Sequence, residues 1–139
     1  GTLAAAKQAT LLGLRGIALS TSVARDEPHF EALKPYVAKV LEALLPATEL
    51  TLVNVNFPDS PRGLKWTCQS VRHYDGKVVT GADPMGREHH WITVVPIEHA
   101  EEGTDRRAIM DGFASMTPLR LDLTDHEALS AARARYPLG

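Results

Sequence analysis

The chain has 139 residues, of which 44% are hydrophobic and 23% are charged, and its formal net charge is −2. This length suits one domain with a core of its own, and the near-neutral charge excludes the basic field that drives nucleic-acid binding. No apolar run reaches the roughly 20 residues that cross a bilayer, and no signal-peptide layout is present. We therefore expect a cytoplasmic location, with neither nucleic acid nor membrane as a partner.

Residues 3–12 predict the first helix, because this stretch is rich in alanine, the strongest helix former. Thr2 is the expected N-cap, since its hydroxyl can accept from a free N–H of the first turn. Gly13 provides the left-handed residue that commonly follows a helix. The short apolar run at residues 16–20 then predicts a buried parallel strand.

Residues 30–44 carry the clearest helical pattern of the chain. Apolar side chains recur at spacings of three and four and so share one face: Phe30, Leu33, Val37, Val40, Leu41 and Leu44. Pro28 suits the first turn, and Pro46 lies just past the end. Residues 50–58 read as a strand closed by proline. This alternation of helices and strands predicts a parallel sheet covered by helices.

The pattern becomes antiparallel after this strand. Residues 64–72 and 77–80 flank Asp75-Gly76, which is a strong hairpin signal. Residues 90–95 form a further expected strand. We interpret this region as a β-hairpin excursion from the α/β core, of a kind that often serves oligomer contacts or frames a site.

The final third of the chain predicts three elements, a short helix at residues 105–111, a strand at residues 113–121 and a terminal helix at residues 125–136. Thr104 or Asp105 can cap the short helix, and Thr124 or Asp125 the terminal one. We divide the single domain into an α/β core part at residues 1–58, the excursion at residues 59–100 and a C-terminal strand and helix at residues 101–139.

Side chains that commonly bind metals do not cluster in the sequence. Cys68 is the only cysteine, so a thiolate cluster within the chain is excluded and a small core residue is expected. His89 and His90 are strand neighbours that point to opposite faces. Two pairs of adjacent acids fall in predicted loops, where solvated surface acids are the commoner case: Asp26-Glu27 and Glu101-Glu102.

Five short motifs follow one another in a fixed order. They are Gly1-Thr2-Leu3-Ala4-Ala5-Ala6 with Gly16-Ile17-Ala18-Leu19-Ser20, Leu52-Val53-Asn54-Val55-Asn56-Phe57-Pro58, Asp83-Pro84-Met85-Gly86 followed by Trp91, Gly103-Thr104-Asp105 with Ser115-Met116-Thr117-Pro118-Leu119, and Asp122-Leu123-Thr124. Together they resemble the C-terminal half of the SurE (survival protein E) family over nearly the whole chain. The third motif also predicts a turn, because proline fixes φ and glycine permits positive φ.

The resemblance implies a Rossmann-like three-layer α/β sheet, here lacking its N-terminal strands, with a β-hairpin excursion and a C-terminal helix. It implies metal-dependent hydrolysis of 5′- and 3′-nucleoside monophosphates, with magnesium or manganese, by a homo-oligomer of two or four subunits. The metal ligands that it implies, two adjacent aspartates, a serine and an asparagine, have no matching positions here. We therefore expect no catalytic residue or metal ligand in this chain, and an inactive chain in isolation.

Gly1 and Thr2 are the candidate phosphate-binding residues, because a helix N-terminus offers free N–H groups to an anion; an ordinary capped helix is the alternative. Asn56 ends a predicted parallel strand, where ligands of α/β proteins bind, although stabilising a loop is the simpler expectation. Thr104 and Asp105 either order a loop beside the site or cap a helix.

The tryptophans leave two interpretations open. Trp91 can stack on a nucleobase, but Trp66 and Trp91 are more simply core or interface anchors. The whole chain also has a non-enzymatic alternative, an oligomerisation or scaffold unit completed by a separate N-terminal segment. Because a sheet without its first strands exposes an edge and an apolar face, we expect the chain to self-associate.

Overall fold

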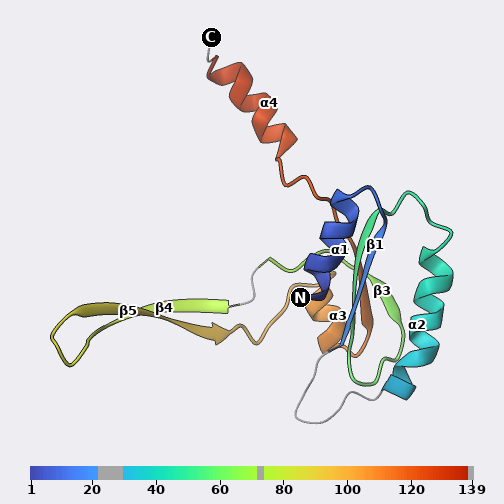
Figure 1. The fold of residues 1–139 in the computed structure, drawn as a ribbon, viewed down its shortest axis with the longest axis horizontal. Coiled ribbons are helices and arrows are strands. Elements are labelled where there is room, and N and C mark those ends of the chain that lie inside the picture. The colour runs from blue at the N-terminus through green and yellow to red at the C-terminus, as the bar shows by residue number, and fades with distance from the viewer. Residues whose placement is uncertain (22–29, 72–73, 138–139) are drawn as a thin grey trace.

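The computed structural model describes residues 1–21, 30–71 and 74–137. Their elements are α1 (Thr2–Leu11), β1 (Gly16–Thr21), α2 (Phe30–Leu44), β2 (Leu52–Phe57), β3 (Leu64–Trp66), β4 (Tyr74–Ala82), β5 (Glu88–Pro96), α3 (Asp105–Met110), β6 (Ala114–Pro118) and α4 (His126–Arg135). Strands β1, β2, β6 and β3 form one sheet in that order, and β4 pairs with β5 alone (Figure 1). Asp26, Glu27, Pro28 and Arg72 lie outside the described residues.

The predicted parallel pair is confirmed. Strands β1 and β2 run parallel, with Gly16 opposite Leu52, and α2 lies between them in the chain. Strand β6 runs antiparallel to β2, and β3 runs parallel to β6 at the far edge. The sheet is therefore mixed, and β3 contributes to it although its residues fall within the expected excursion.

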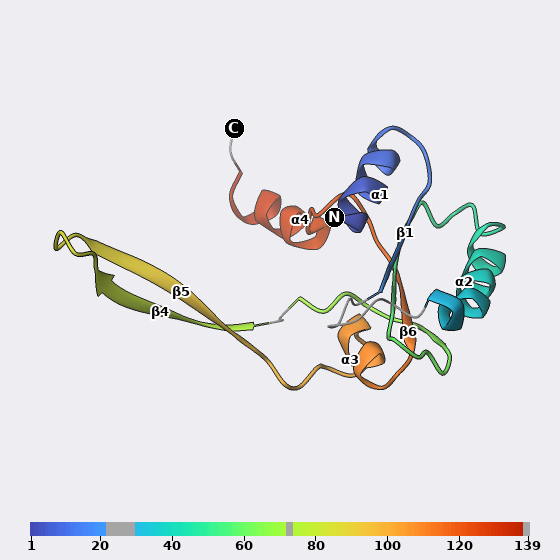
Figure 2. The same ribbon diagram turned by 60° about the horizontal axis from the view of Figure 1, so that its bottom comes forward.

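The sheet has helices on both faces, which gives the expected three-layer α/β fold (Figure 2). Helix α2 buries Leu33, Val40 and Leu44 against alternate residues of β2 and β6, as its apolar stripe predicts. Phe30 is an exception, because its side chain is 63% exposed at the first position of α2. Helices α1 and α3 cover the opposite face, where Ala6 packs with Ala18 and Leu52.

The start of α1 differs from the prediction. The N–H of Ala5 donates to the carbonyl of Gly1 at 3.3 Å, so Gly1 is the N-cap and Thr2 already lies inside the helix. Only the N-cap residue, which precedes the first helical residue, can accept from the free N–H groups of the first turn with its side chain. The Thr2 hydroxyl therefore does not cap α1. At the other end, Gly13 has the expected positive φ of 79°.

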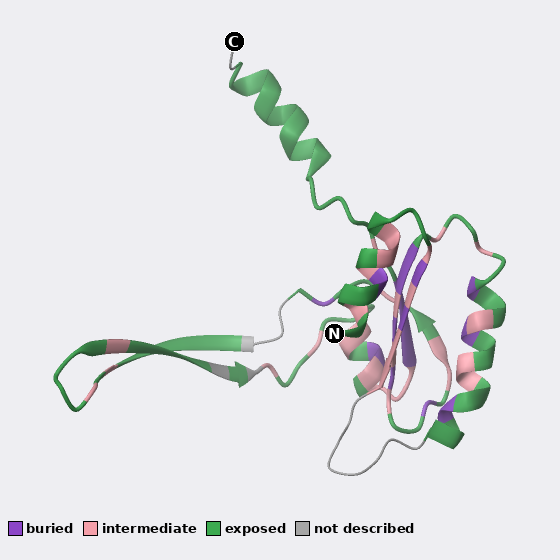
Figure 3. Ribbon diagram, in the orientation of Figure 1, coloured by how far each residue is buried: buried purple, intermediate pink, exposed green. Residues whose placement is uncertain are grey.

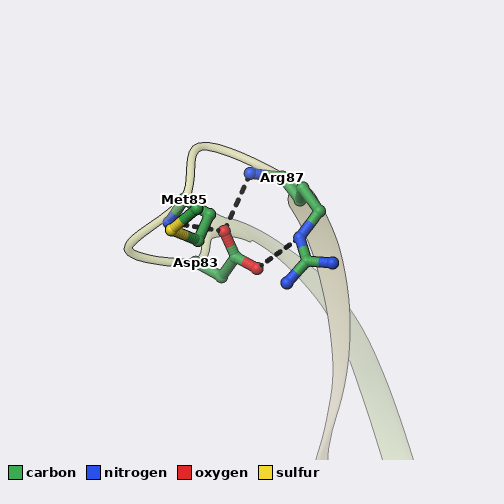
Figure 4. Close-up of polar contacts among 3 residues, drawn as sticks. All are labelled: Asp83, Met85 and Arg87. Atoms are coloured by element: carbon green, nitrogen blue, oxygen red, sulfur yellow. Dashed lines mark hydrogen bonds and ion pairs between the residues drawn. The ribbon is translucent and has the colours of Figure 1, made fainter.

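The tip of the hairpin also differs from the prediction. Asp75 and Gly76 lie within β4, paired with Val95 and Val94, rather than in a turn. The turn lies instead between β4 and β5, at the motif Asp83-Pro84-Met85-Gly86, where the sequence also predicted one. The Asp83 carboxylate accepts there from the N–H groups of Met85 and Arg87 (Figure 4). These bonds, led by that from Arg87, lower the pKa of Asp83. The long antiparallel register thus outweighs the local turn preference of Asp-Gly.

The hairpin and α4 extend away from the sheet, and α4 has no buried residue (Figure 3). Its N-cap is Asp125, whose carboxylate accepts from the N–H of Ala128. Cys68, expected in the core, is exposed, because β3 ends at Trp66 and the chain then leaves the sheet. Trp66 and Trp91 are 57% and 64% exposed, so neither belongs to the core of this chain. No helix within the described ranges is long and apolar enough to cross a membrane.

Candidate functional site

The N-terminus of α1 is the first component of the candidate site. Gly1 and Thr2 are exposed, no side chain makes a capping hydrogen bond there, and the first turn carries no acid. Its N–H groups therefore keep their hydrogen-bonding capacity and the positive end of the helix dipole. Such an arrangement favours an anion over a cation.

A row of polar side chains crosses the face of the sheet that α1 and α3 cover. Ser20, Asn56 and Ser115 are register partners on three adjacent strands. They alternate with the core residues that α2 covers, so they point to the face of α1 and α3. The Asn56 amide donates to the Ser115 hydroxyl at 3.5 Å, a long bond. Asn56 thus lies near the carboxyl end of β2, where ligands of open α/β sheets bind.

A second polar row lies beside the first. Asn54 and Thr117 are register partners, and the Thr117 hydroxyl is 2.7 Å from that of Thr67. Ser115 and Thr117 are 0% and 2% exposed. Such polar positions in a sheet interior are unusual unless they are hydrogen-bonded. The sequence signal was the alternation of asparagine with valine in β2, which pointed to Asn56 but not to the serine and threonine of β6.

Thr104 and Asp105 hold the start of α3 against the segment that follows β3. Thr104 is the N-cap and accepts from the N–H of Arg107 at 3.2 Å. The Asp105 carboxylate accepts from the N–H of Ser70 at 2.9 Å, and its own N–H donates to the carbonyl of Cys68. Within the described ranges, no hydrogen bond joins Thr104 or Asp105 to the residues proposed at α1.

A cavity of about 360 Å³ lies between β3 and α3, and the sequence did not predict it. Its lining includes Trp66 and two side chains of each charge, Lys65, Arg107, Glu102 and Asp111. Arg107 and Asp111 form an ion pair at 3.0 Å. The mixed charges give this cavity no clear preference for an anion, unlike the N-terminus of α1.

The residues that the structure describes do not fit a divalent cation held by this chain alone. No group of three or more His, Cys, Asp or Glu side chains lies close enough within the described ranges to hold a metal ion. Magnesium and manganese prefer several oxygen ligands around one centre. The half-buried His89 and the exposed His90 lie on opposite faces of the hairpin, because their register partners Gly81 and Thr80 are successive residues.

Comparisons with known proteins agree on one family. A sequence model described as Survival protein SurE matches residues 1–76. The 5′-nucleotidase SurE of Erythrobacter litoralis is 42% identical over 98% of this chain and 58% of its own length. That of Geotalea uraniireducens is 38% identical over 96% and 56%. The crystal structure of the SurE protein from Aquifex aeolicus superposes with a TM-score of 0.81 at 33% identity, over 96% of this chain and 56% of that one.

The chain thus spans a little over half the length of the curated relatives it matches. The family model covers more than half of this chain, and the superposition extends the match over the sheet, the hairpin and α4. The first, second and fourth motifs lie on or at the ends of core helices and strands, the third lies at the hairpin turn and on β5, and the fifth lies between β6 and α4. The chain belongs to the SurE family.

Proposed function

We propose that this chain forms part of a phosphatase that hydrolyses the phosphomonoester of nucleoside monophosphates, at the 5′ or the 3′ position. The observation that carries the proposal is the free N-terminus of α1 on the polar face of the sheet. The names of the relatives, 5′-nucleotidase SurE, support it. A cytoplasmic location is part of the proposal.

The geometry supports binding and orientation of a phosphate group. The free N–H groups of Gly1, Thr2 and the rest of the first turn donate to phosphate oxygens, and the helix dipole favours their charge. The Asn56 side chain lies on the face of the sheet that α1 covers. Its hydrogen bond to Ser115 is long, so its amide can also donate to a phosphate oxygen. We assign no proton transfer to this chain and propose that magnesium or manganese takes its ligands from residues other than those described.

The first prediction concerns activity. The 139-residue chain is expected to release no phosphate from AMP in the presence of manganese. The same chain joined to the part of the Erythrobacter litoralis relative that it does not match is expected to be active. The measurement is colorimetric phosphate release, with heat-denatured chimera as the control. Equal activity of the short chain and the chimera would show that this chain holds the cation by itself.

A second candidate function, an oligomerisation unit, is favoured by exposed apolar side chains on both faces of the hairpin. Val79 and Trp91 are register partners on one face, and Val78 and Ile92 on the other; all four are 48% to 74% exposed. An isolated two-stranded ribbon is at best marginally stable in water. We propose that a second copy of this chain covers the hairpin, giving a homo-dimer or a homo-tetramer.

The test of this proposal is the mass of the particle in solution. We expect light scattering after size-exclusion chromatography to give a mass above that of a monomer, and Trp91→Ser to lower it. Leu12→Ser is the matched control, because Leu12 is 71% exposed but lies far along the chain from the hairpin, just after α1. A monodisperse wild-type monomer would reject the proposal.

A further inference from the structure

Arg106 has a buried charged nitrogen without a partner. Its Nη1 is the only buried side-chain nitrogen or oxygen without a hydrogen-bond acceptor in the part of the chain that the structure describes. A guanidinium stays charged in proteins, and all of its N–H groups are donors. Burying such a donor unpaired is costly, so this nitrogen suits an acceptor that the described side chains do not supply, such as an oxygen of a bound anion or of water.

The position of Arg106 on α3 sets the direction from which that acceptor comes. Thr104, Arg107, Ala108 and Asp111 line the cavity beside β3. Successive residues of a helix are rotated by about 100°, so Arg106 lies on the flank of α3 away from this cavity. Helix α3 packs on β6 and β2, and β3 lies beyond β6. The flank with Arg106 therefore faces the β2 side of the sheet.

The surface on that side is the polar face already described. Asn54 and Asn56 of β2 point toward the layer of α1 and α3. In both views the end of α1 marked N is the end nearer to α3 (Figures 1 and 2). A cationic side chain, two amides and a helix N-terminus thus belong to one face, and each of them suits an anionic oxygen.

The neighbouring Arg107 shows how an arginine of this helix behaves when it is structural. Its Nε lies 3.0 Å from Asp111 Oδ1, one turn further along the helix, and its side chain is 46% exposed. Arg107 thus has its own carboxylate and open contact with water. The Nη1 of Arg106 has neither a carboxylate partner nor open contact with water, although Arg106 and Arg107 are adjacent arginines of the same helix.

We infer that Arg106 binds the phosphate group of the substrate, an inference that rests on the proposed function. The planar guanidinium can donate two parallel N–H bonds to two phosphate oxygens. Such binding would give the buried Nη1 the acceptor that the described residues do not supply. Arg106 is then a binding residue that fixes the orientation of the phosphate against the N-terminus of α1.

The experiment measures inorganic phosphate binding to the 139-residue chain by isothermal titration calorimetry at constant ionic strength. Arg106→Gln is expected to raise the Kd for phosphate roughly tenfold or more, since it removes charge-assisted hydrogen bonds to the phosphate oxygens. Arg107→Gln, the matched control, is expected to change it less than about twofold, because an exposed ion pair contributes little. Arg106→Lys keeps the charge without the fork and is expected to be intermediate, so it carries the test if Arg106→Gln does not fold.

Thermal unfolding without phosphate separates binding from a structural role. Arg106→Gln is expected to unfold at the same or a higher temperature than wild type, since it removes a buried guanidinium nitrogen that has no acceptor. A structural arginine predicts the opposite sign. The inference is overturned if wild type binds no phosphate, if the Arg106 variants bind it like wild type, or if Arg107→Gln weakens binding equally.

Titration with AMP in place of inorganic phosphate, and the activity assay on the chimera, distinguish this inference from the proposed function. Arg106-dependent phosphate binding with an inactive chimera would support the inference and reject the phosphatase. An active chimera whose Arg106→Gln variant binds phosphate and AMP normally would support the phosphatase and overturn the inference.

Discussion

Replacing Arg15 with methionine is expected to lower the free energy of unfolding by about 3 kcal/mol, a large share of the roughly 5–15 kcal/mol of a typical domain. The Arg15 guanidinium donates to the carbonyls of Leu44 at 2.6 Å, Ala47 at 2.8 Å, Leu45 at 3.0 Å and Leu50 at 3.4 Å. These carbonyls belong to the end of α2 and the loop before β2. One side chain therefore satisfies acceptors that a helix C-terminus leaves open.

The measurement is urea unfolding followed by circular dichroism. Arg107→Met is the matched control, because it removes an exposed ion pair with Asp111 and should cost less than about 1 kcal/mol. Arg15→Lys should recover only part of the loss, since an ammonium cannot reproduce the planar fork. Equal midpoints for Arg15→Met and Arg107→Met would contradict the role given to Arg15.

Gly16→Ala is expected to destabilise the fold by at least about 3 kcal/mol or to prevent folding. A Cβ at this position would lie 2.3 Å from the carbonyl oxygen of Ala6 and 2.8 Å from the Thr10 hydroxyl. The obstructing atoms of Ala6 belong to the backbone of α1, so relief requires the helix to move off β1. Packing of Ala6 on Ala18 and Leu52 would be lost with it.

The effect is measured by the same urea titration. Gly76→Ala provides the control, because its nearest neighbouring atom would be 3.8 Å away, an ordinary contact. This change is expected to alter stability by no more than about 0.5 kcal/mol, as for most surface substitutions. A Gly16→Ala protein with wild-type stability would mean that α1 does not approach β1 as closely as described.

Local patterns predicted the elements of the core well. The apolar stripe of α2 and the runs of β1 and β2 identified these elements to within about two residues at each end, because burial of one helix face or of a whole strand imposes a period on the sequence. Phe30 departed from its stripe because it lies at the first position of the helix, where its face no longer meets the sheet.

The hairpin was placed wrongly by the same local reasoning. Asp75-Gly76 has the composition of a turn, but nine paired residues on each strand extend through it. The turn forms instead at Asp83-Pro84-Met85-Gly86, the other turn that the sequence predicted, where the Asp83 carboxylate satisfies two N–H groups at once. Which of two possible turns forms depends on the register of the whole ribbon, and this register is not encoded in any four residues.

Some residues of the candidate site were predicted from the sequence, and others were found only in the structure. The sequence alone identified the family, and it pointed to Gly1, Thr2 and Asn56 through helix and strand termini whose chemistry is local. Only the tertiary structure placed Ser115 beside Asn56, left Nη1 of Arg106 buried without an acceptor and brought the Arg15 guanidinium to the end of α2. Those contacts join residues 29 to 59 positions apart, or depend on what packs around a side chain. Periodicity reports which face of an element is buried, whereas burial against a particular partner is decided by how the elements pack.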